Sequence, residues 1–242
     1  MPYGLTQSGD LERDSEQWFE NADLDAEAGS TDFTLETWIK FESLPASTAY
    51  YTIGGLWGGT GSSFLFQFFN DAGTHKLTCY VNDPLDNNEQ YVKASGTLST
   101  GTWYHVAFSW DASASTGEFF LNGASLGTDT KTKTSFKDPG NSTFGIGATT
   151  GTTQEFDGRV SLFRVWTATR TATQINDNKC LVLGATASLI AEWTLDNTLN
   201  DNSGSGFTLT NNNLATFAVD VPGVCGAAAS INPRRMMTGL GM

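Results

Sequence analysis

The chain has 242 residues and a formal net charge of −13, and only 16% of its residues are charged. The acidic balance and a pI near 4.4 argue against binding to nucleic acid or to an anionic membrane. Aromatic residues make up 12% of the chain, which is too many for a disordered protein and favours strands over helices. No apolar run approaches the roughly 20 residues that span a bilayer, so we expect no membrane insertion.

The N-terminal segment and the cysteines indicate the compartment. The first 18 residues are acidic and have no apolar segment like that of a secretory signal, so either the chain is not exported by that route or the signal precedes this sequence. Cys79, Cys180 and Cys225 are odd in number and irregularly spaced, unlike a disulfide scaffold or a zinc site. We expect three reduced thiols in a chain made in a cytoplasm, although a Cys180–Cys225 bridge stays open.

Strand patterns begin at residues 32–42, where Phe33, Leu35, Ile39 and Phe41 share one face and Trp38 lies on the other. Residues 63–70 are apolar on both faces, which predicts an inner strand covered on both sides. A four-residue turn over 70–73 and a returning strand over 75–82 complete a predicted hairpin.

Further strands are predicted over 103–111 and 118–121, and the tip Asn122-Gly123 leads into a return strand that starts at 124–127. Later strands are expected over 143–147, 158–166, 189–195 and 207–210, and residues 171–177 form the one helical turn. Roughly a dozen strands with almost no helix indicate two packed antiparallel sheets. We expect one sandwich domain over residues 1–222, followed by an extended arm over residues 223–242.

The order of several motifs indicates a family. ETWIKF is followed by WYHVAFSWD, GEFFLNGASLG and FGIGATTGTTQEFDGRVSLFRVW. Over about residues 30–177 this order resembles the laminin-G-like, concanavalin A-like jelly rolls, including the pentraxin-like branch. The resemblance implies an all-β, two-sheet jelly roll, and the stretch AEWTLDNTLNDNSGSGF resembles a segment that would supply closing strands over about 189–220.

Catalysis is not expected, although this fold also hosts glycoside hydrolases. Such enzymes need two carboxyl groups that face each other across a sugar cleft, and hydrolase relatives carry them as E-x-D-x-E on one strand. No convincing strand here has that triplet, and the acidic stretch from Glu16 to Glu27 has the pattern of a solvated surface. His75 and His105 lack the context of a triad and are predicted to pack structurally.

Two kinds of binding site are considered. Calcium takes six to eight oxygen ligands, and relatives hold the ion at an Asp-rich, Gly-punctuated turn, although Asn, Asp and Gly are also ordinary turn formers. A glycan needs an exposed aromatic platform, although most aromatic residues of a sandwich fill its core. The metal candidates are Asp196, Asp201, Asn202, Ser203, Asn70 and Asp71, and the glycan-binding candidates are Trp57, Tyr50, Tyr51 and Tyr91, of which Trp57 lies in the most glycine-rich stretch.

The arm over residues 223–242 leads to a separate prediction, that it docks on a neighbouring subunit. Its basic pair and flexible apolar residues suit docking on an acidic, apolar groove of a neighbouring subunit, although a tail without a role is equally compatible. It also resembles the endings of laminin-G-like virion proteins of tailed phages. The docking residues are Arg234, Arg235, Met236, Met237 and Leu240.

Three functions follow from these observations. The first is a non-enzymatic virion protein, a capsid decoration or tail-associated subunit that contacts other virion subunits or its own copies and sometimes host glycans. The alternative is a calcium-assisted carbohydrate-binding lectin module, and an endoglycosidase is the least favoured.

Overall fold

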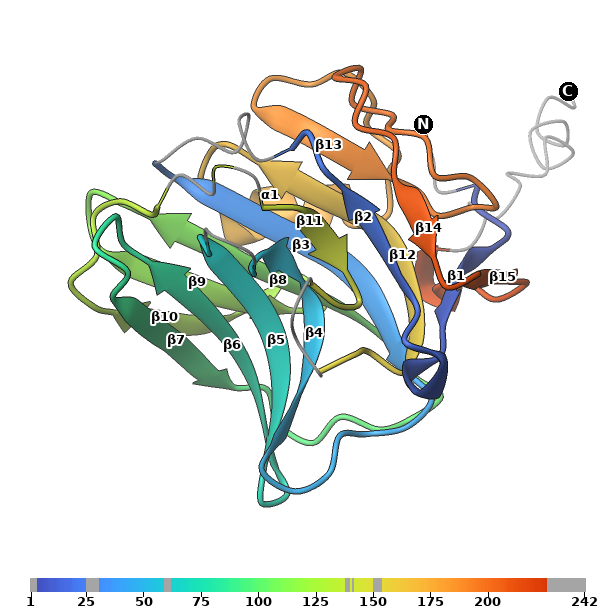
Figure 1. Cartoon of the computed structure of the whole chain (residues 1–242), viewed down its shortest axis with the longest axis horizontal. Coiled ribbons are helices and arrows are strands. Elements are labelled where there is room, and N and C mark those ends of the chain that lie inside the picture. Colours follow the sequence, from blue (N-terminus) through green and yellow to red (C-terminus); the bar gives the residue numbers. More distant parts are fainter. Residues whose placement is uncertain are drawn as a thin grey trace, which may run out of the picture.

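The protein is a two-layer β-sandwich (Figure 1). The computed structural model describes residues 4–24, 31–58, 62–137, 140, 142–149 and 154–225. All the strand pairs among the described residues are antiparallel, and the predicted all-β jelly-roll class is confirmed.

One sheet has eight strands. Seven of them follow the spatial order β10-β9-β8-β3-β12-β1-β15, and β13 also pairs with β12. Their bounds are β1 Ser8–Leu11, β3 Phe33–Phe41, β8 Trp103–Asp111, β9 Thr116–Leu121, β10 Ala124–Thr130, β12 Gly158–Trp166, β13 Leu189–Trp193 and β15 Thr216–Ala218.

The other sheet has seven strands in the order β14-β2-β11-β4-β5-β6-β7. In Figure 1 it lies in front of the eight-stranded sheet. Its strands are β2 Trp18–Asn21, β4 Ala49–Leu56, β5 Phe64–Asp71, β6 Thr74–Asn82, β7 Asn88–Ala94, β11 Phe144–Ile146 and β14 Thr210–Asn212.

The core lies between the sheets and follows the period-two pattern of the sequence. Phe33 of β3 stacks on Phe64 of β5 with ring centroids 4.4 Å apart. Phe41 of β3 contacts Phe68 of β5 in a tilted arrangement, with ring centroids 4.6 Å apart, so aromatic pairs hold the two layers together. The inner strand predicted over 63–70 is β5, in which Leu65 on the opposite face is also only 3% exposed.

Two hairpin tips test the turn predictions. Asn122-Gly123 joins β9 to β10 with positive φ values of 54° and 84°, as a tight two-residue turn requires. The turn predicted over 70–73 is shorter than expected, because Asp71 already pairs with Thr74 and only two residues lie between the strands.

The predicted helical turn is the helix α1, Ala172–Asn178. Thr171 accepts a hydrogen bond from the backbone N–H of Gln174, whose side chain accepts one from the Thr171 N–H, so a capping box starts the helix. Ile175 packs with Ala107 and Phe120 and thereby covers part of the outer face of the eight-stranded sheet. Two short 3-10 helices, η1 Arg13–Ser15 and η2 Gly223–Cys225, complete the described elements.

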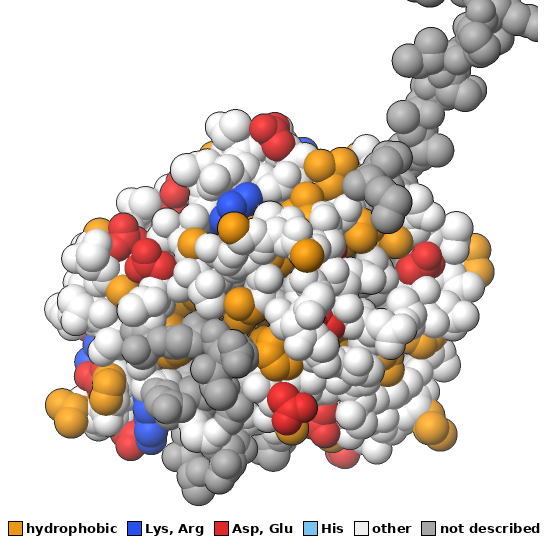
Figure 2. Space-filling model, turned by 90° about the horizontal axis from the view of Figure 1, so that it is seen from above, with side chains coloured by type: hydrophobic (Ala, Val, Ile, Leu, Met, Phe, Trp, Pro, Cys, Tyr) orange, Lys and Arg blue, Asp and Glu red, His pale blue; other side chains and the backbone are white. Residues whose placement is uncertain are grey.

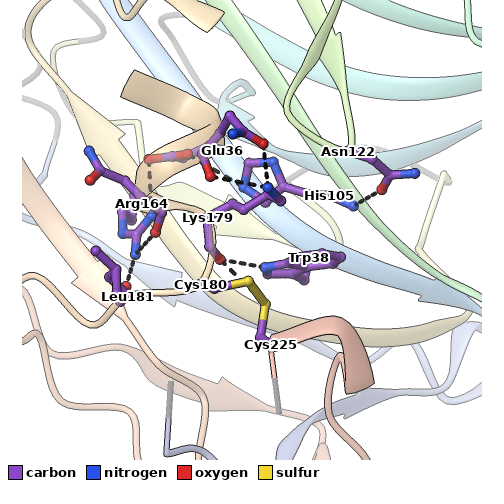
Figure 3. The surroundings of a disulfide bond; sticks show 11 residues. Glu36, Trp38, His105, Asn122, Arg164, Lys179, Cys180, Leu181 and Cys225 are labelled. Atoms are coloured by element: carbon purple, nitrogen blue, oxygen red, sulfur yellow. Dashed lines mark hydrogen bonds and ion pairs between the residues drawn. A yellow bond between two sulfur atoms is a disulfide. The ribbon is translucent and has the colours of Figure 1, made fainter. Parts of the chain in front are cut away.

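The cysteine prediction is wrong for two of the three thiols. Cys180, just after α1, forms a disulfide with Cys225 in η2, which lies 45 residues along the chain (Figure 3). The backbone carbonyl of Lys179 beside it accepts a hydrogen bond from Trp38 Nε1 at 2.7 Å. Odd counts and irregular spacing do not reveal which cysteines lie close together, and Cys79 is the buried free thiol.

The C-terminal third differs in detail from the prediction. Phe207 and Leu209 are buried but lie outside any strand, and the closing strands are β14 and β15 instead. All five docking residues that we predicted in the arm, from Arg234 to Leu240, lie outside the described residues.

Candidate functional site: an aromatic strip on the seven-stranded sheet

The outer face of the seven-stranded sheet carries a pair of stacked rings. Tyr50 of β4 and Phe69 of β5 are direct partners in the strand register. Their rings are nearly parallel at 9°, with centroids 4.1 Å apart. The Tyr50 hydroxyl lies 3.4 Å from Nε2 of Gln90 on β7, so this side chain extends across the sheet toward its edge strand.

A second pair continues the same surface. Trp57, directly after β4, lies 5.8 Å from Tyr80 of β6. Burial, together with the neighbouring Tyr50, raises the pKa of Tyr80 to about 12. All four rings are partly exposed, and we call Tyr50, Trp57, Phe69 and Tyr80 the aromatic strip.

Polar groups form the floor beside the strip. Thr52, Gln67 and Thr78 are register partners on three adjacent strands, and each is at most 1% exposed. Gln67 Nε2 donates to Gln154 Oε1 at 2.5 Å. The hydroxyls of Thr52 and Thr78 have no hydrogen-bond partner among the described residues. Because these three residues are buried, the groups that a ligand can reach on this face are the four partly exposed rings and the partly exposed amide of Gln90.

The sequence identified half of this strip. Tyr50 and Trp57 belong to it, whereas Tyr51 and Tyr91 are 2% and 0% exposed and belong to the core, so a sugar-stacking role does not fit them. Tyr51 points inward because neighbouring residues of a strand face opposite sides. Alternation already placed Phe69 on the face of Leu65 and Gln67, but Tyr80 could be found only by fixing the hairpin register.

In the turn predicted to bind calcium, the carboxylate of Asp201 accepts hydrogen bonds on both of its oxygens. Asp201 Oδ1 accepts from the backbone N–H groups of Glu192 and Ser203 at 2.9 and 2.8 Å. Its Oδ2 accepts from the hydroxyl of Ser203 and from the N–H groups of Gly206 and Phe207 at 2.8, 3.0 and 3.3 Å. A carboxylate surrounded by donors is arranged to close a turn, so this geometry does not fit a calcium ligand.

The other metal candidates are dispersed. Asp196 Oδ1 accepts from the N–H groups of Thr6 and Gln7 and so fastens the N-terminal segment. Asn70 accepts from the Gly73 N–H in its turn, and Asp71 forms an ion pair with Lys76 at 2.5 Å. Asn202 and Ser203 are uncharged, so Asp201 has no second carboxylate among the residues next to it in this turn.

A cluster of three acidic residues that no sequence pattern predicted lies elsewhere on the surface. Asp10, Glu12 and Glu42 have carboxylate oxygens within 4.8 Å of one another. Arg159 pairs with Asp10 at 3.3 Å and with Glu42 at 3.1 Å. The pKa of Glu12 is raised by burial and then by Glu42 and Asp10. The group is therefore a partly neutralised surface network.

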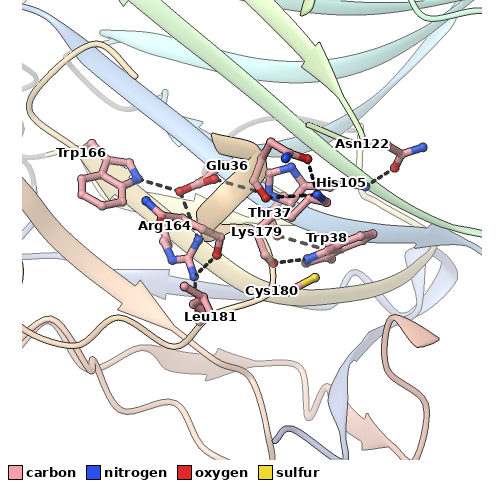
Figure 4. Close-up of polar contacts among 12 residues, drawn as sticks. Glu36, Thr37, Trp38, His105, Asn122, Arg164, Trp166, Lys179, Cys180 and Leu181 are labelled. Carbon is pink, nitrogen blue, oxygen red and sulfur yellow. Dashed lines mark hydrogen bonds and ion pairs between the residues drawn. The ribbon is translucent and has the colours of Figure 1, made fainter. Parts of the chain in front are cut away.

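A buried charge network lies under α1 on the opposite sheet (Figure 4). Arg164 donates to Glu192 Oε1 at 2.8 Å and to Glu36 Oε1 at 3.1 Å. Trp166 Nε1 donates to the same Glu36 oxygen at 2.9 Å. His105 Nε2 lies 3.4 Å from Glu36 Oε2, and burial lowers the pKa of His105. Because Arg164, Glu36 and Glu192 are at most 1% exposed, the two carboxylates do not face a cleft.

These features correspond to a known family. A profile described as the concanavalin A-like lectin/glucanases superfamily matches residues 14–176. The chain belongs to this superfamily. The laminin-G-like resemblance read from the motifs is thereby confirmed. No match was found among curated proteins.

Solved structures share this concanavalin A-like fold. A Bacteroides ovatus protein provisionally named as carbohydrate-binding is 20% identical, with a TM-score of 0.69 over 88% of this chain and 60% of that one. This chain thus spans less than two thirds of that protein's length. The SAP-like pentraxin of Limulus polyphemus is 15% identical, with a TM-score of 0.61 over 91% and 96% of the two chains.

A third similar structure is the CBM40 domain of the Ruminococcus gnavus IT-sialidase bound to α2,3-sialyllactose. It is 13% identical, with a TM-score of 0.54 over 73% of this chain and 100% of that one. At these identities the likeness shows the fold. Within the described part of this concanavalin A-like chain, no helix has the length and apolar character needed to cross a bilayer.

Proposed function

We propose that the protein is a carbohydrate-binding module that holds a glycan on the aromatic strip. The observation that carries the proposal is the arrangement of four partly exposed rings on one sheet face, beside the partly exposed amide of Gln90. A sugar ring has an apolar C–H face that packs on an aromatic ring, and hydroxyls that need hydrogen-bond partners.

The polar neighbours of the strip suit a neutral glycan. Gln90, which is partly exposed next to Tyr50, supplies an amide group that both donates and accepts. Lys76, the register partner of Phe69, is already paired with Asp71. Figure 2 views the molecule from above and shows hydrophobic and acidic side chains scattered over that side, with few basic ones.

The comparisons support binding as the general class. The Bacteroides protein and the Ruminococcus domain are named for carbohydrate binding, and both have this fold. The virion role stays a prediction, because neither the described structure nor the comparisons test it and the arm from residue 226 onward lies outside the described residues.

The test is a set of single substitutions in the strip, measured by calorimetric titration with lactose, cellotriose, xylotriose and mannotriose. Tyr50→Ala and Trp57→Ala are each expected to weaken binding about tenfold or more, since a truncated aromatic anchor commonly costs about 2 kcal/mol. Leu214→Ala serves as the control, because Leu214 is 84% exposed and lies away from the strip in sequence and sheet order. Full affinity in both strip variants would contradict the proposal.

A further inference from the structure

A second pocket opens on the outer face of the eight-stranded sheet. It has a volume of about 280 Å³ and lies between strands β8–β10 and the segment that leads into α1. Its lining combines two carboxylates, one guanidinium and several hydroxyls, from Asp111, Glu118, Arg170, Thr116, Thr128 and Thr169. The aromatic strip lies on the other sheet, so the two sites face opposite sides of the sandwich.

Arg170 is held in place without an ion pair. Its guanidinium lies 4.1 Å from the ring centroid of Trp166, which is fully buried beneath it. Its backbone N–H donates to Ser109 Oγ at 2.9 Å, and Ser109 Oγ also accepts from Thr34 at 2.9 Å. The guanidinium itself has no hydrogen bond or ion pair with any described residue, so its donors are available to a ligand.

The two carboxylates are fixed by neutral partners. Asp111 accepts from the Ser113 hydroxyl at 2.7 Å and from the Ala114 N–H at 2.9 Å. Glu118 accepts from the Ser125 hydroxyl at 2.5 Å. Neither forms an ion pair with a cation in the described part of the chain, although Arg170 lines the same pocket. The opposite charges are therefore more than 4.0 Å apart.

We propose that this pocket is a second saccharide site, in which one sugar unit bridges Arg170 and the carboxylates Asp111 and Glu118. A sugar hydroxyl accepts from a guanidinium and donates to a carboxylate, so neighbouring hydroxyls satisfy both charges at once. A neutral ligand also brings no charge of its own to desolvate. The inference goes beyond the aromatic strip and does not require it.

Two sites on opposite faces change what the module does. One chain could hold two glycan strands, or two parts of one branched glycan, and so link them. Engagement of both sites raises the overall affinity through effective concentration.

The experiment counts sites on the whole chain by calorimetric titration with lactose, cellotriose, xylotriose and mannotriose, and repeats the titrations in variants. Arg170→Gln and Glu118→Gln are each expected to remove one of two sites, or to weaken it roughly tenfold, because they remove charge-assisted hydrogen bonds. Thr173→Ala, an exposed hydroxyl of α1 outside the pocket lining, is the matched control. Thermal unfolding of each variant checks that the fold is retained, and Glu118→Gln tests the pocket if Arg170→Gln is unstable.

The outcomes separate this site from the aromatic strip. Loss of one site in the pocket variants and of the other in Trp57→Ala supports both proposals. Loss of all binding in Trp57→Ala, with no effect of the pocket variants, overturns the second site and leaves the strip intact. Loss of all binding in the pocket variants alone keeps the pocket and overturns the strip. Binding of glycine or glutamate in the pocket, with no saccharide bound, would identify a zwitterion site and overturn the inference.

Discussion

Replacing Arg164 by Met would test the buried charge network most directly. Arg164 is fully buried and donates to Glu192, to Glu36 and to the backbone carbonyls of Asn178 and Leu181. Met keeps a long apolar side chain of similar reach but removes the charge and every donor. Two buried carboxylates would then share the site without a cation.

The expected cost follows from what remains around each carboxylate. Removing one partner of a buried ion pair typically costs about 3–5 kcal/mol, because the other charge stays buried and unpaired. Glu192 keeps hydrogen bonds from the N–H groups of Leu183 and Gly184, which limits its share of the loss. Glu36 keeps only Trp166 and His105, so most of the cost falls on Glu36. We expect a loss near 3–5 kcal/mol at pH 7.

The assay is urea unfolding followed by tryptophan fluorescence. A triple variant, Arg164→Met with Glu36→Gln and Glu192→Gln, is the matched comparison, because it removes the stranded charges and should recover a large part of the loss. A loss below about 1 kcal/mol in the single variant would refute the reasoning, since it would mean that solvent or another cation reaches Glu36.

Four further predictions concern the pH dependence of stability, the disulfide and calcium. The pKa of Glu36, which burial alone would raise, is lowered from 4.5 to about 2 chiefly by Arg164, so its contribution of about 3 kcal/mol is present above pH 4.5 and lost as the pH falls toward 2. Burial lowers the pKa of His105 and of His75, so stability should begin to fall below about pH 6.5, and a double His→Gln variant should show a flatter profile between pH 7 and 5 in urea titrations. Cys180→Ser opens a 45-residue loop and should cost about 4 kcal/mol in the chain-entropy account, with the bond itself checked by mass spectrometry of unreduced peptides. Asp201→Asn should lower the free energy of unfolding by about 1–3 kcal/mol, because the carboxylate closes its turn by accepting hydrogen bonds. EDTA should leave the Tm of the unmodified chain within about 1 °C. A larger shift with EDTA would show that the turn binds calcium after all.

The sandwich could be predicted because its strands repeat the same alternation of core-facing and outward-facing residues. Phe33, Leu35, Ile39 and Phe41 alternate with residues of the other face, and the structure buries them in the core. The cap at Thr171 and the tip at Asn122-Gly123 are local patterns of the same kind, and both are confirmed. These features depend on neighbours in sequence, which a single chain shows directly.

The sites were harder to predict because they depend on register. Tyr80 meets Trp57 only when the pairing of β5 with β6 is fixed, and shifting it by one residue would turn Tyr80 to the other face. The disulfide joins segments that no local pattern relates. Asp201 has the composition of a calcium turn, and the direction of the surrounding N–H groups decides against that use. Composition indicates which side chains could form a site, and the strand register determines which of those side chains lie next to one another.

The coverage of the two outer faces explains why we propose one saccharide site on each sheet. On the eight-stranded sheet, α1 and the disulfide-linked segment cover the middle of the face, where Arg164 and Glu36 are buried. Arg170 lies outside the covered part of the face, on the ring of Trp166, and lines the pocket. No described helix covers the strip on the seven-stranded sheet, and Tyr50 and Trp57 remain partly exposed there. Single exposed apolar side chains such as Leu214 are ordinary, but four partly exposed rings gathered on one face form a patch, and such a patch is more readily explained by a ligand than by stability.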